Sequence, residues 1–258
     1  MATGCMYACM CEGLLIGSLG VEFQLSYPRL ISAPLVSTPL ASTRLVSIQL
    51  VSAHESKTYW KLGVHSGVSQ GNSSCMALAL KSSYAIEPTK HSFNKLLKNI
   101  ELNPSIKNQI TPIQAFITSK ESKPDTVYTS WELNSEEKKH SQHLGVKKSL
   151  EDCILIALDQ LVEKNKIKKS IIKCDVDGNE LFVFESGINF LRKFKPIIIM
   201  ELAPYLYPES GYKSSDLFNF FKKYGYKYFE VHTKKEIHNI QDFSDAIPAG
   251  SSKNIFLI

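Results

Sequence analysis

The feature that most constrains the fold is an alternation of β-prone and helix-periodic segments from residue 57 to the C-terminus. Short apolar runs rich in β-branched residues, such as 170–174 and 196–200, are typical of strands covered on both faces. Between such runs, apolar side chains recur with helical spacing, as in residues 93–100. The alternation predicts an α/β domain with a mostly parallel sheet and helices on both faces.

Individual elements follow from the same patterns. We expect strands at 59–64, 82–86, 109–117, 170–174, 196–200, 226–231 and 254–258, helices at 75–80, 93–100, 181–191 and 217–224, and a strand running into a helix at 155–162. In sheets of this kind, ligands bind beyond the carboxyl ends of the strands. The residues directly after each expected strand are therefore the candidates for function.

The composition changes near residue 56. The first 56 residues contain no lysine, and residues 28–52 form a five-residue repeat with leucine at its third position. Five units that include Pro34 and Pro39 are too few for a stacked β-helix. We expect residues 1–55 to be a low-complexity, poorly ordered extension and residues 56–258 to be the folded domain.

Composition also narrows the classes of partner. The net charge of +5 is mild and lysines are interleaved with acids, so we expect no nucleic-acid partner. No apolar run reaches the roughly 18–20 residues of a membrane-spanning helix, and the apolar start lacks the basic region of a secretory signal. The six cysteines match neither a disulfide framework nor a zinc site, which favours a cytoplasmic protein without a metal centre.

The first candidate site is the loop His65-Ser-Gly67-Val-Ser69-Gln-Gly71. It follows an expected strand and precedes an expected helix. Glycines there let the backbone approach a nucleotide-like ligand, and a helix N-terminus offers unpaired N–H groups. A tight turn without a ligand is an equally simple explanation of the two glycines alone.

Two further candidate sites follow expected strands. Glu87-Pro88 ends the strand at 82–86, where a carboxylate can accept hydrogen bonds from both ribose hydroxyls of an adenosine group. Asp175 and Asp177 end the strand at 170–174, and two carboxylates on one loop can face one cleft. The alternatives are a solvated Glu87, and a turn at 177–179 that only starts the next helix.

These motifs together resemble the FkbM-type methyltransferases. The run from His65 to Pro88 is similar to that family's glycine loop followed by a strand ending in Glu-Pro. Residues 171–181 and 195–201 are similar to its Ile-Lys-x-Asp-Val-Glu/Asp-Gly-x-Glu and Lys-Pro-x-x-x-x-Glu segments, and residues 157–161 to its Thr-Leu-Asp-x-Leu segment. The resemblance covers residues 57–258.

The resemblance implies a Rossmann-like, doubly wound, seven-stranded sheet and S-adenosyl-L-methionine (SAM)-dependent O-methylation of a sugar, glycan or natural-product hydroxyl. It implies that SAM contacts a set of loop and strand-end residues: His65, Gly67, Ser69, Gly71, Glu87, Pro88 and Asp175. Asp175 and Asp177 would position the reacting groups. His143, in a polar loop, is a candidate base, although a solvated loop histidine is the simpler interpretation.

One departure from the family pattern supports a second hypothesis. His65 stands where the glycine loop has an acid near the positively charged amino-acid end of SAM. Losing one charge-assisted contact costs roughly 1.5–3 kcal/mol. The alternative function is therefore a catalytically impaired protein that binds SAM weakly or serves as an interaction module. A nicotinamide-dependent dehydrogenase is disfavoured because the glycines do not follow the Gly-x-Gly-x-x-Gly spacing.

Overall fold

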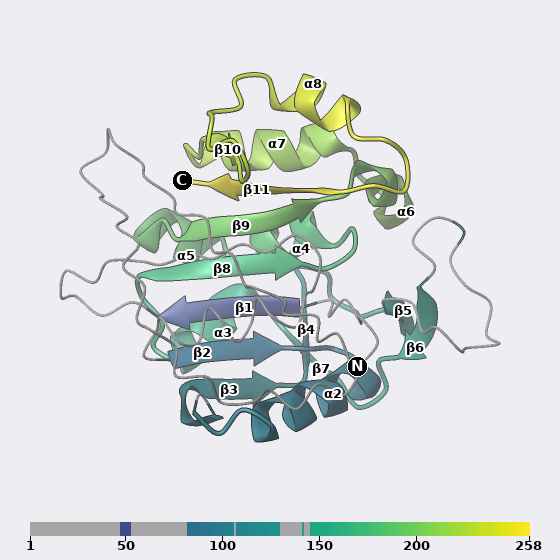
Figure 1. Cartoon of the computed structure of the whole chain (residues 1–258), viewed down its shortest axis with the longest axis vertical. Coiled ribbons are helices and arrows are strands. Elements are labelled where there is room, and N and C mark those ends of the chain that lie inside the picture. The colour runs from purple at the N-terminus through teal and green to yellow at the C-terminus, as the bar shows by residue number, and fades with distance from the viewer. Residues whose placement is uncertain (1–46, 53–81, 106, 130–140, 142–144) are drawn as a thin grey trace, which may run out of the picture.

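The computed structural model describes residues 47–52, 82–105, 107–129, 141 and 145–258 (Figure 1). Its strands are β1 (Ser47–Ser52), β2 (Ser82–Ile86), β3 (Ile110–Ile113), β4 (Ala115–Ile117), β5 (Thr126–Thr129), β6 (Val146–Ser149), β7 (Ile154–Ile156), β8 (Ser170–Asp175), β9 (Ile197–Leu202), β10 (Tyr228–Glu230) and β11 (Lys253–Leu257). Its helices are α2 (Lys90–Glu101), α3 (Leu158–Lys164), α4 (Glu180–Glu185), α5 (Ile188–Phe194), α6 (Tyr207–Ser210), α7 (Ser214–Lys223) and α8 (Ile240–Asp245), with short 3-10 turns η1 (Lys107–Gln109) and η2 (Pro204–Leu206).

Seven strands form one sheet in the order β10-β11-β9-β8-β1-β2-β3. The pairs β2–β3 and β8–β9 are parallel, whereas β1 and β11 run antiparallel to both of their neighbours. Figure 1 shows β2, β3, β8 and β9 pointing one way and β1 and β11 the other. The α/β class is confirmed, but the expectation of a mostly parallel sheet is corrected to a mixed one, because four of the six pairings are antiparallel.

Strand β1 joins the two halves of the sheet. Ile48 pairs with Ile86 of β2 and with Cys174 of β8, and the ladders continue to Ser52 on both sides. These residues fall within the segment expected to be poorly ordered, so the sheet begins before the compositional break near residue 56. The expected strand at 59–64 and helix at 75–80 lie outside the described residues.

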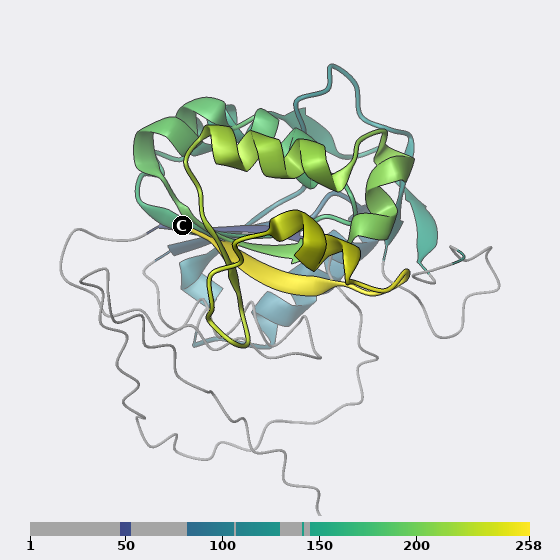
Figure 2. The same cartoon turned by 90° about the horizontal axis from the view of Figure 1, so that it is seen from above.

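The sheet has a distinct core on each face. Alternate residues of β2 point to opposite sides, so Ile86 joins the main core with α3, α4, α5 and α7, while Ala85 joins a smaller core under α2. Figure 2 shows α2 on the opposite side of the sheet from these helices. Helix α2 begins at the N-cap Thr89, whose side chain accepts a hydrogen bond from the backbone N–H of Ser92.

The contact between α3 and α5 gives residues 157–161 a structural role. Leu158 is fully buried, and the carboxylate of Asp159 accepts hydrogen bonds from the backbone N–H groups of Asn189 (3.1 Å) and Phe190 (2.8 Å). A Cβ atom on Gly187 would lie 2.5 Å from Cδ2 of Leu158, so only glycine fits there. Residues 157–161 therefore pack and cap helices.

One expected strand and one expected helix are each divided into two elements in the structure. The strand expected at 109–117 is divided at Gln114 into β3 and β4. These two strands belong to different sheets. The helix expected at 181–191 becomes α4 and α5, which meet at Gly187. The short strands β5 and β6 were not expected. Helix α7 ends at Lys223 with Tyr224 as its C-cap, and Gly225 follows with φ 73°, as the sequence predicts.

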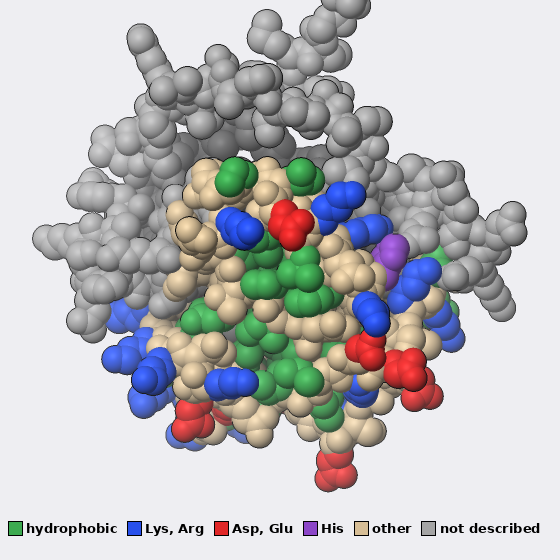
Figure 3. Space-filling model, turned by 90° about the horizontal axis from the view of Figure 1, so that it is seen from below, with side chains coloured by type: hydrophobic (Ala, Val, Ile, Leu, Met, Phe, Trp, Pro, Cys, Tyr) green, Lys and Arg blue, Asp and Glu red, His purple; other side chains and the backbone are tan. Residues whose placement is uncertain are grey.

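One end of the domain has a partly apolar surface. Figure 3 shows this end, where α2 and β3 close the sheet, with hydrophobic side chains gathered between charged ones. Leu102, which follows α2, is 61% exposed, and Ile154 of β7 is 52% exposed. Within the described ranges, no helix is long and apolar enough to cross a membrane.

The central position of β1 can be tested with proline. We expect Leu50→Pro to lower stability by about 1–3 kcal/mol, because it removes an N–H from the ladder and leaves the paired carbonyl without that hydrogen bond. In a chain of this size, that loss shifts the melting temperature by about 2–12 °C. Circular dichroism melting measures it. Leu50→Val keeps the N–H and serves as the control; equal melting of the proline and valine variants would contradict a central β1.

Candidate functional site

Three carboxylates, those of Glu87, Asp175 and Glu201, lie at or next to the C-terminal ends of β2, β8 and β9 in the main sheet. Ser47 of β1 pairs with Asp175, and Ile48 pairs with Ile86, so Asp175 and Glu87 flank the same end of β1. On the other side of β8, Cys174 pairs with Met200 of β9, which places Glu201 beside Asp175. Strand register therefore brings together residues that are up to 114 positions apart in the sequence.

Glu87 is the most unusual member of this row. It is 1% exposed, and neither carboxylate oxygen has a hydrogen-bond partner among the described residues. Burial, and after it the negative charge of Asp175, raises the pKa of Glu87 well above its ordinary value, although Lys173 acts in the opposite direction. A buried carboxyl group with both oxygens unsatisfied destabilises a fold unless a ligand supplies donors.

Lys173 supplies a positive charge to this edge. Its Nζ lies 2.9 Å from Oδ2 of Asp175, and both side chains are nearly buried. Burial disfavours the ammonium form, but the charge and hydrogen bond of Asp175, together with the nearby charge of Glu201, outweigh burial and raise the pKa of Lys173. Glu201 accepts a hydrogen bond from the hydroxyl of Ser252. The row thus combines one ion pair with further acidic groups.

The turn after β8 holds Asp177 in a strained conformation. Asp177 and Gly178 both have positive φ, 45° and 90°, and the N–H of Asn179 bonds to the carbonyl of Val176 at 3.3 Å. Two positive φ values define a type I′ turn, and a non-glycine residue there costs about 1–2 kcal/mol. The segment therefore forms a turn before a helix, although Asn179 makes no side-chain cap of α4. The role of Asp177 toward a ligand stays a prediction.

A cavity of about 450 Å³ opens beside this turn. Its apolar walls include Pro88, Phe116 and Val176, and Asp177 reaches it from the turn. Further lining residues come from the loop after β4, from β5 and from the η2–α6 segment: Lys120, Ser122, Lys123, Tyr128, Leu206, Glu209 and Ser210. The volume lies in the range of ligand-binding pockets.

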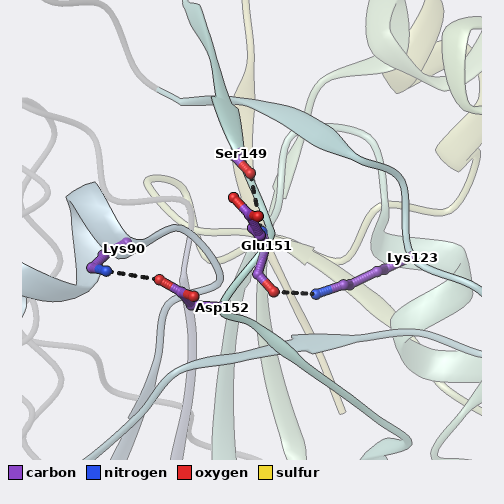
Figure 4. A network of polar contacts seen from close by, with 5 residues as sticks. All are labelled: Lys90, Lys123, Ser149, Glu151 and Asp152. Carbon is purple, nitrogen blue, oxygen red and sulfur yellow. Dashed lines mark hydrogen bonds and ion pairs between the residues drawn. The ribbon is translucent and has the colours of Figure 1, made fainter.

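Lys123 fixes the loop that forms one wall of the cavity. Its ammonium donates hydrogen bonds to the backbone carbonyls of Leu150, Glu151 and Cys153 in the turn between β6 and β7. Figure 4 shows this turn, together with the ion pair between Lys90 and Asp152. The loop after β4 is therefore tied to a neighbouring turn, which preserves the shape of that wall.

The structure brings together four of the predicted site residues. Glu87 and Asp175 flank the end of β1, and Pro88 and Asp177 line the adjacent cavity. The other predicted residues lie outside the described residues and stay predictions: His65, Gly67, Ser69, Gly71 and His143. No group of three or more potential metal ligands occurs within the described ranges.

Sequence reasoning missed three contributors to this region. Lys173 had a detectable signal, because it lies two residues before Asp175 on the same strand and so on the same face. Glu180 gave a weaker signal as an acid at the start of an apolar helix. The loop at 120–128 gave none, because its position depends on contacts that are distant in the sequence.

An α/β sheet with buried carboxylates and a cavity at its strand ends defines a ligand-binding domain of the kind found in many enzymes. The family model described as the methyltransferase FkbM domain matches residues 62–228, which is more than half of the chain. The chain therefore belongs to the FkbM methyltransferase family. No curated protein and no solved structure matches it.

Replacing the carboxyl group of Glu87 with an amide should stabilise the folded protein, and this gain should depend on pH. Because its pKa is raised in the folded state, its contribution to stability is retained below the ordinary value of about 4.3 and lost as pH rises. Glu87→Gln cannot ionise. We therefore expect it to melt above the wild type at pH 8, with a smaller difference at pH 5.

Differential scanning calorimetry without ligand measures this difference. Glu163→Gln, an exposed substitution on α3, is the matched control and should show no such trend. A Glu87→Gln difference that is independent of pH would contradict the raised pKa.

Proposed function

We propose that the chain is a SAM-dependent O-methyltransferase that acts on a hydroxyl group of a sugar, glycan or natural product. The observation that carries the proposal is the buried Glu87 carboxylate, whose two oxygens lack partners among the described residues. Membership of the FkbM family supports methyl transfer in general. The acceptor class rests on the resemblance of the sequence motifs.

An adenosyl group is supported by the chemistry of Glu87 and of the cavity beside it, which is lined by the two chain neighbours of Glu87, Ile86 and Pro88. Two adjacent ribose hydroxyls are two donors, and the Glu87 carboxylate offers two acceptor oxygens for them. Bonds to the ionised form would lower the pKa that burial has raised. The apolar walls at Pro88, Phe116 and Val176 suit a planar aromatic base. In this function the sheet would serve as a Rossmann-like arrangement in which β1 runs antiparallel to β2 and β8.

Once bound, SAM supplies an electrophilic methyl group carried on a sulfonium. The protein must then orient the acceptor hydroxyl and remove its proton. Asp177 lines the cavity, which supports it as the group that accepts that proton. Asp175 is held by Lys173, which fixes its orientation, and with Glu201 adds negative charge that complements a cationic ligand. His143 remains an alternative base.

Polar groups of the cavity support a hydroxyl-rich acceptor. Ser122, Asn179 and Ser210 line it with groups that both donate and accept hydrogen bonds. The proposed reaction needs no metal, because a carboxylate base suffices for a hydroxyl that is held in line with the methyl group. Buried free thiols at Cys153 and Cys174 support a reducing, cytoplasmic location.

A second candidate function is favoured by His65. A protein that retains the fold but lacks the acid of the glycine loop would bind SAM weakly, or would act as an interaction module. His65→Asp separates the two functions: a large gain in the thermal shift produced by S-adenosylhomocysteine favours an impaired binder. An equal shift in both proteins favours a competent enzyme.

Substitution of Glu87 tests the ribose assignment. We expect Glu87→Ala to weaken S-adenosylhomocysteine binding at least tenfold, because the lost bonds to a charged group are worth about 1.5–3 kcal/mol. Isothermal titration calorimetry at pH 8 measures the affinity, with Glu163→Gln as the control. Unchanged affinity in a folded Glu87→Ala variant would overturn the assignment.

Methyl transfer itself is tested with labelled SAM and a panel of glycans, with products identified by mass spectrometry. Removal of a general base lowers rates by about 10²–10⁴-fold. We expect Asp177→Asn to lower turnover by at least about 100-fold while binding of S-adenosylhomocysteine changes far less. Full activity of Asp177→Asn would exclude this residue as the base.

A further inference from the structure

The carboxylate of Glu180 lies beneath the turn that carries Asp177. Glu180 is the first residue of α4 and is 1% exposed. One oxygen, Oε1, accepts hydrogen bonds from the backbone N–H groups of Val176 and Gly178, each at 3.4 Å. The other, Oε2, accepts one from the hydroxyl of Tyr212 at 3.3 Å. All three bonds are long, but they converge on one buried carboxyl group.

The turn needs such an acceptor. The central residues Asp177 and Gly178 have positive φ, and the N–H groups of Val176 and Gly178 both point to the buried carboxylate of Glu180. A buried N–H without a partner is strongly unfavourable. The turn is also confined from the far side, because a Cβ on Gly178 would lie 3.0 Å from Cβ of Leu206.

Tyr212 links the same carboxylate to the neighbouring η2–α6 segment. Its ring stacks on Tyr207 with centroids 4.9 Å apart and meets Phe182 edge-on at 5.6 Å. Tyr207 begins α6, and Leu206 and Ser210 of this segment line the cavity. Glu180 thus connects the turn to the adjacent η2–α6 segment, and residues of both line the cavity.

The surroundings of Glu180 disfavour its charged form. Burial raises the pKa of Glu180 to about 7, and the charge of Asp175 adds to this, while bonds from backbone N–H groups act against it. Tyr207, Tyr212 and Cys174 are the other titratable groups that interact with this carboxyl group. The position therefore carries a cost in stability, as do many positions that organise a binding site.

We propose that Glu180 is a positioning residue whose carboxylate holds the Val176–Gly178 backbone and so fixes Asp177 toward the cavity. The consequence for ligand binding rests on the proposed function, whereas the consequence for the turn does not. A glutamine can also accept both N–H bonds through its carbonyl oxygen and donate to the oxygen of Tyr212. Alanine can do neither, which gives a matched pair of variants.

Hydrogen–deuterium exchange measured by mass spectrometry tests the turn without a ligand. In Glu180→Ala, we expect the peptide covering 175–179 to exchange at least tenfold faster, while the peptide covering β9 stays unchanged. Glu180→Gln should restore protection. Unchanged exchange at 175–179 in Glu180→Ala, or equal acceleration in β9, would overturn the proposal.

Calorimetric titration with S-adenosylhomocysteine tests the consequence for the cavity. We expect Glu180→Ala to bind at least fivefold more weakly and Glu180→Gln to bind within about twofold of the wild type. Wild-type affinity in Glu180→Ala would overturn the link between the turn and the ligand. If the wild type itself does not bind, the proposed function fails, and the exchange experiment still decides the role of Glu180.

Discussion

The pairing of β1 with both β2 and β8 is the constraint on which the candidate site depends. Through this single strand, Glu87 and Asp175 reach the same edge of the sheet although 87 residues separate them in the sequence. The direction of β1 does not matter for this purpose, because register alone places the two strand ends side by side. A strand from a compositionally unusual segment can therefore serve a site built from the rest of the domain.

Three buried or nearly buried acids then share one small region, and each is accommodated differently. Asp175 pairs with Lys173, Glu180 accepts backbone and tyrosine bonds, and Glu87 keeps both oxygens unpaired among the described residues. Burial without partners is unfavourable, so Glu87 differs from the two acids whose partners the structure supplies. The least satisfied group is the one best suited to meet an incoming donor.

The sequence alone predicts the features of this site that depend on local order. Strand ends at Glu87 and Asp175 follow from short apolar runs, and the break after Tyr224 follows from a glycine. Sequence periodicity does not reveal that β1 is antiparallel, because strand direction is set by tertiary pairing. The split at Gly187 was missed because it arises from close contact with Leu158 on another helix. Long-range contacts such as these are absent from any local pattern.

The junction of Asp159, Leu158 and Gly187 has a practical meaning for redesign. A sequence segment shared with a family of enzymes would ordinarily be a first choice for altering ligand preference. Here the aspartate caps a helix and the leucine fills the space that the missing glycine side chain leaves open. Mutant libraries that test the proposed acceptor site should therefore keep these three positions and Lys123 fixed, and should diversify lining positions such as Lys120, Ser122 and Tyr128.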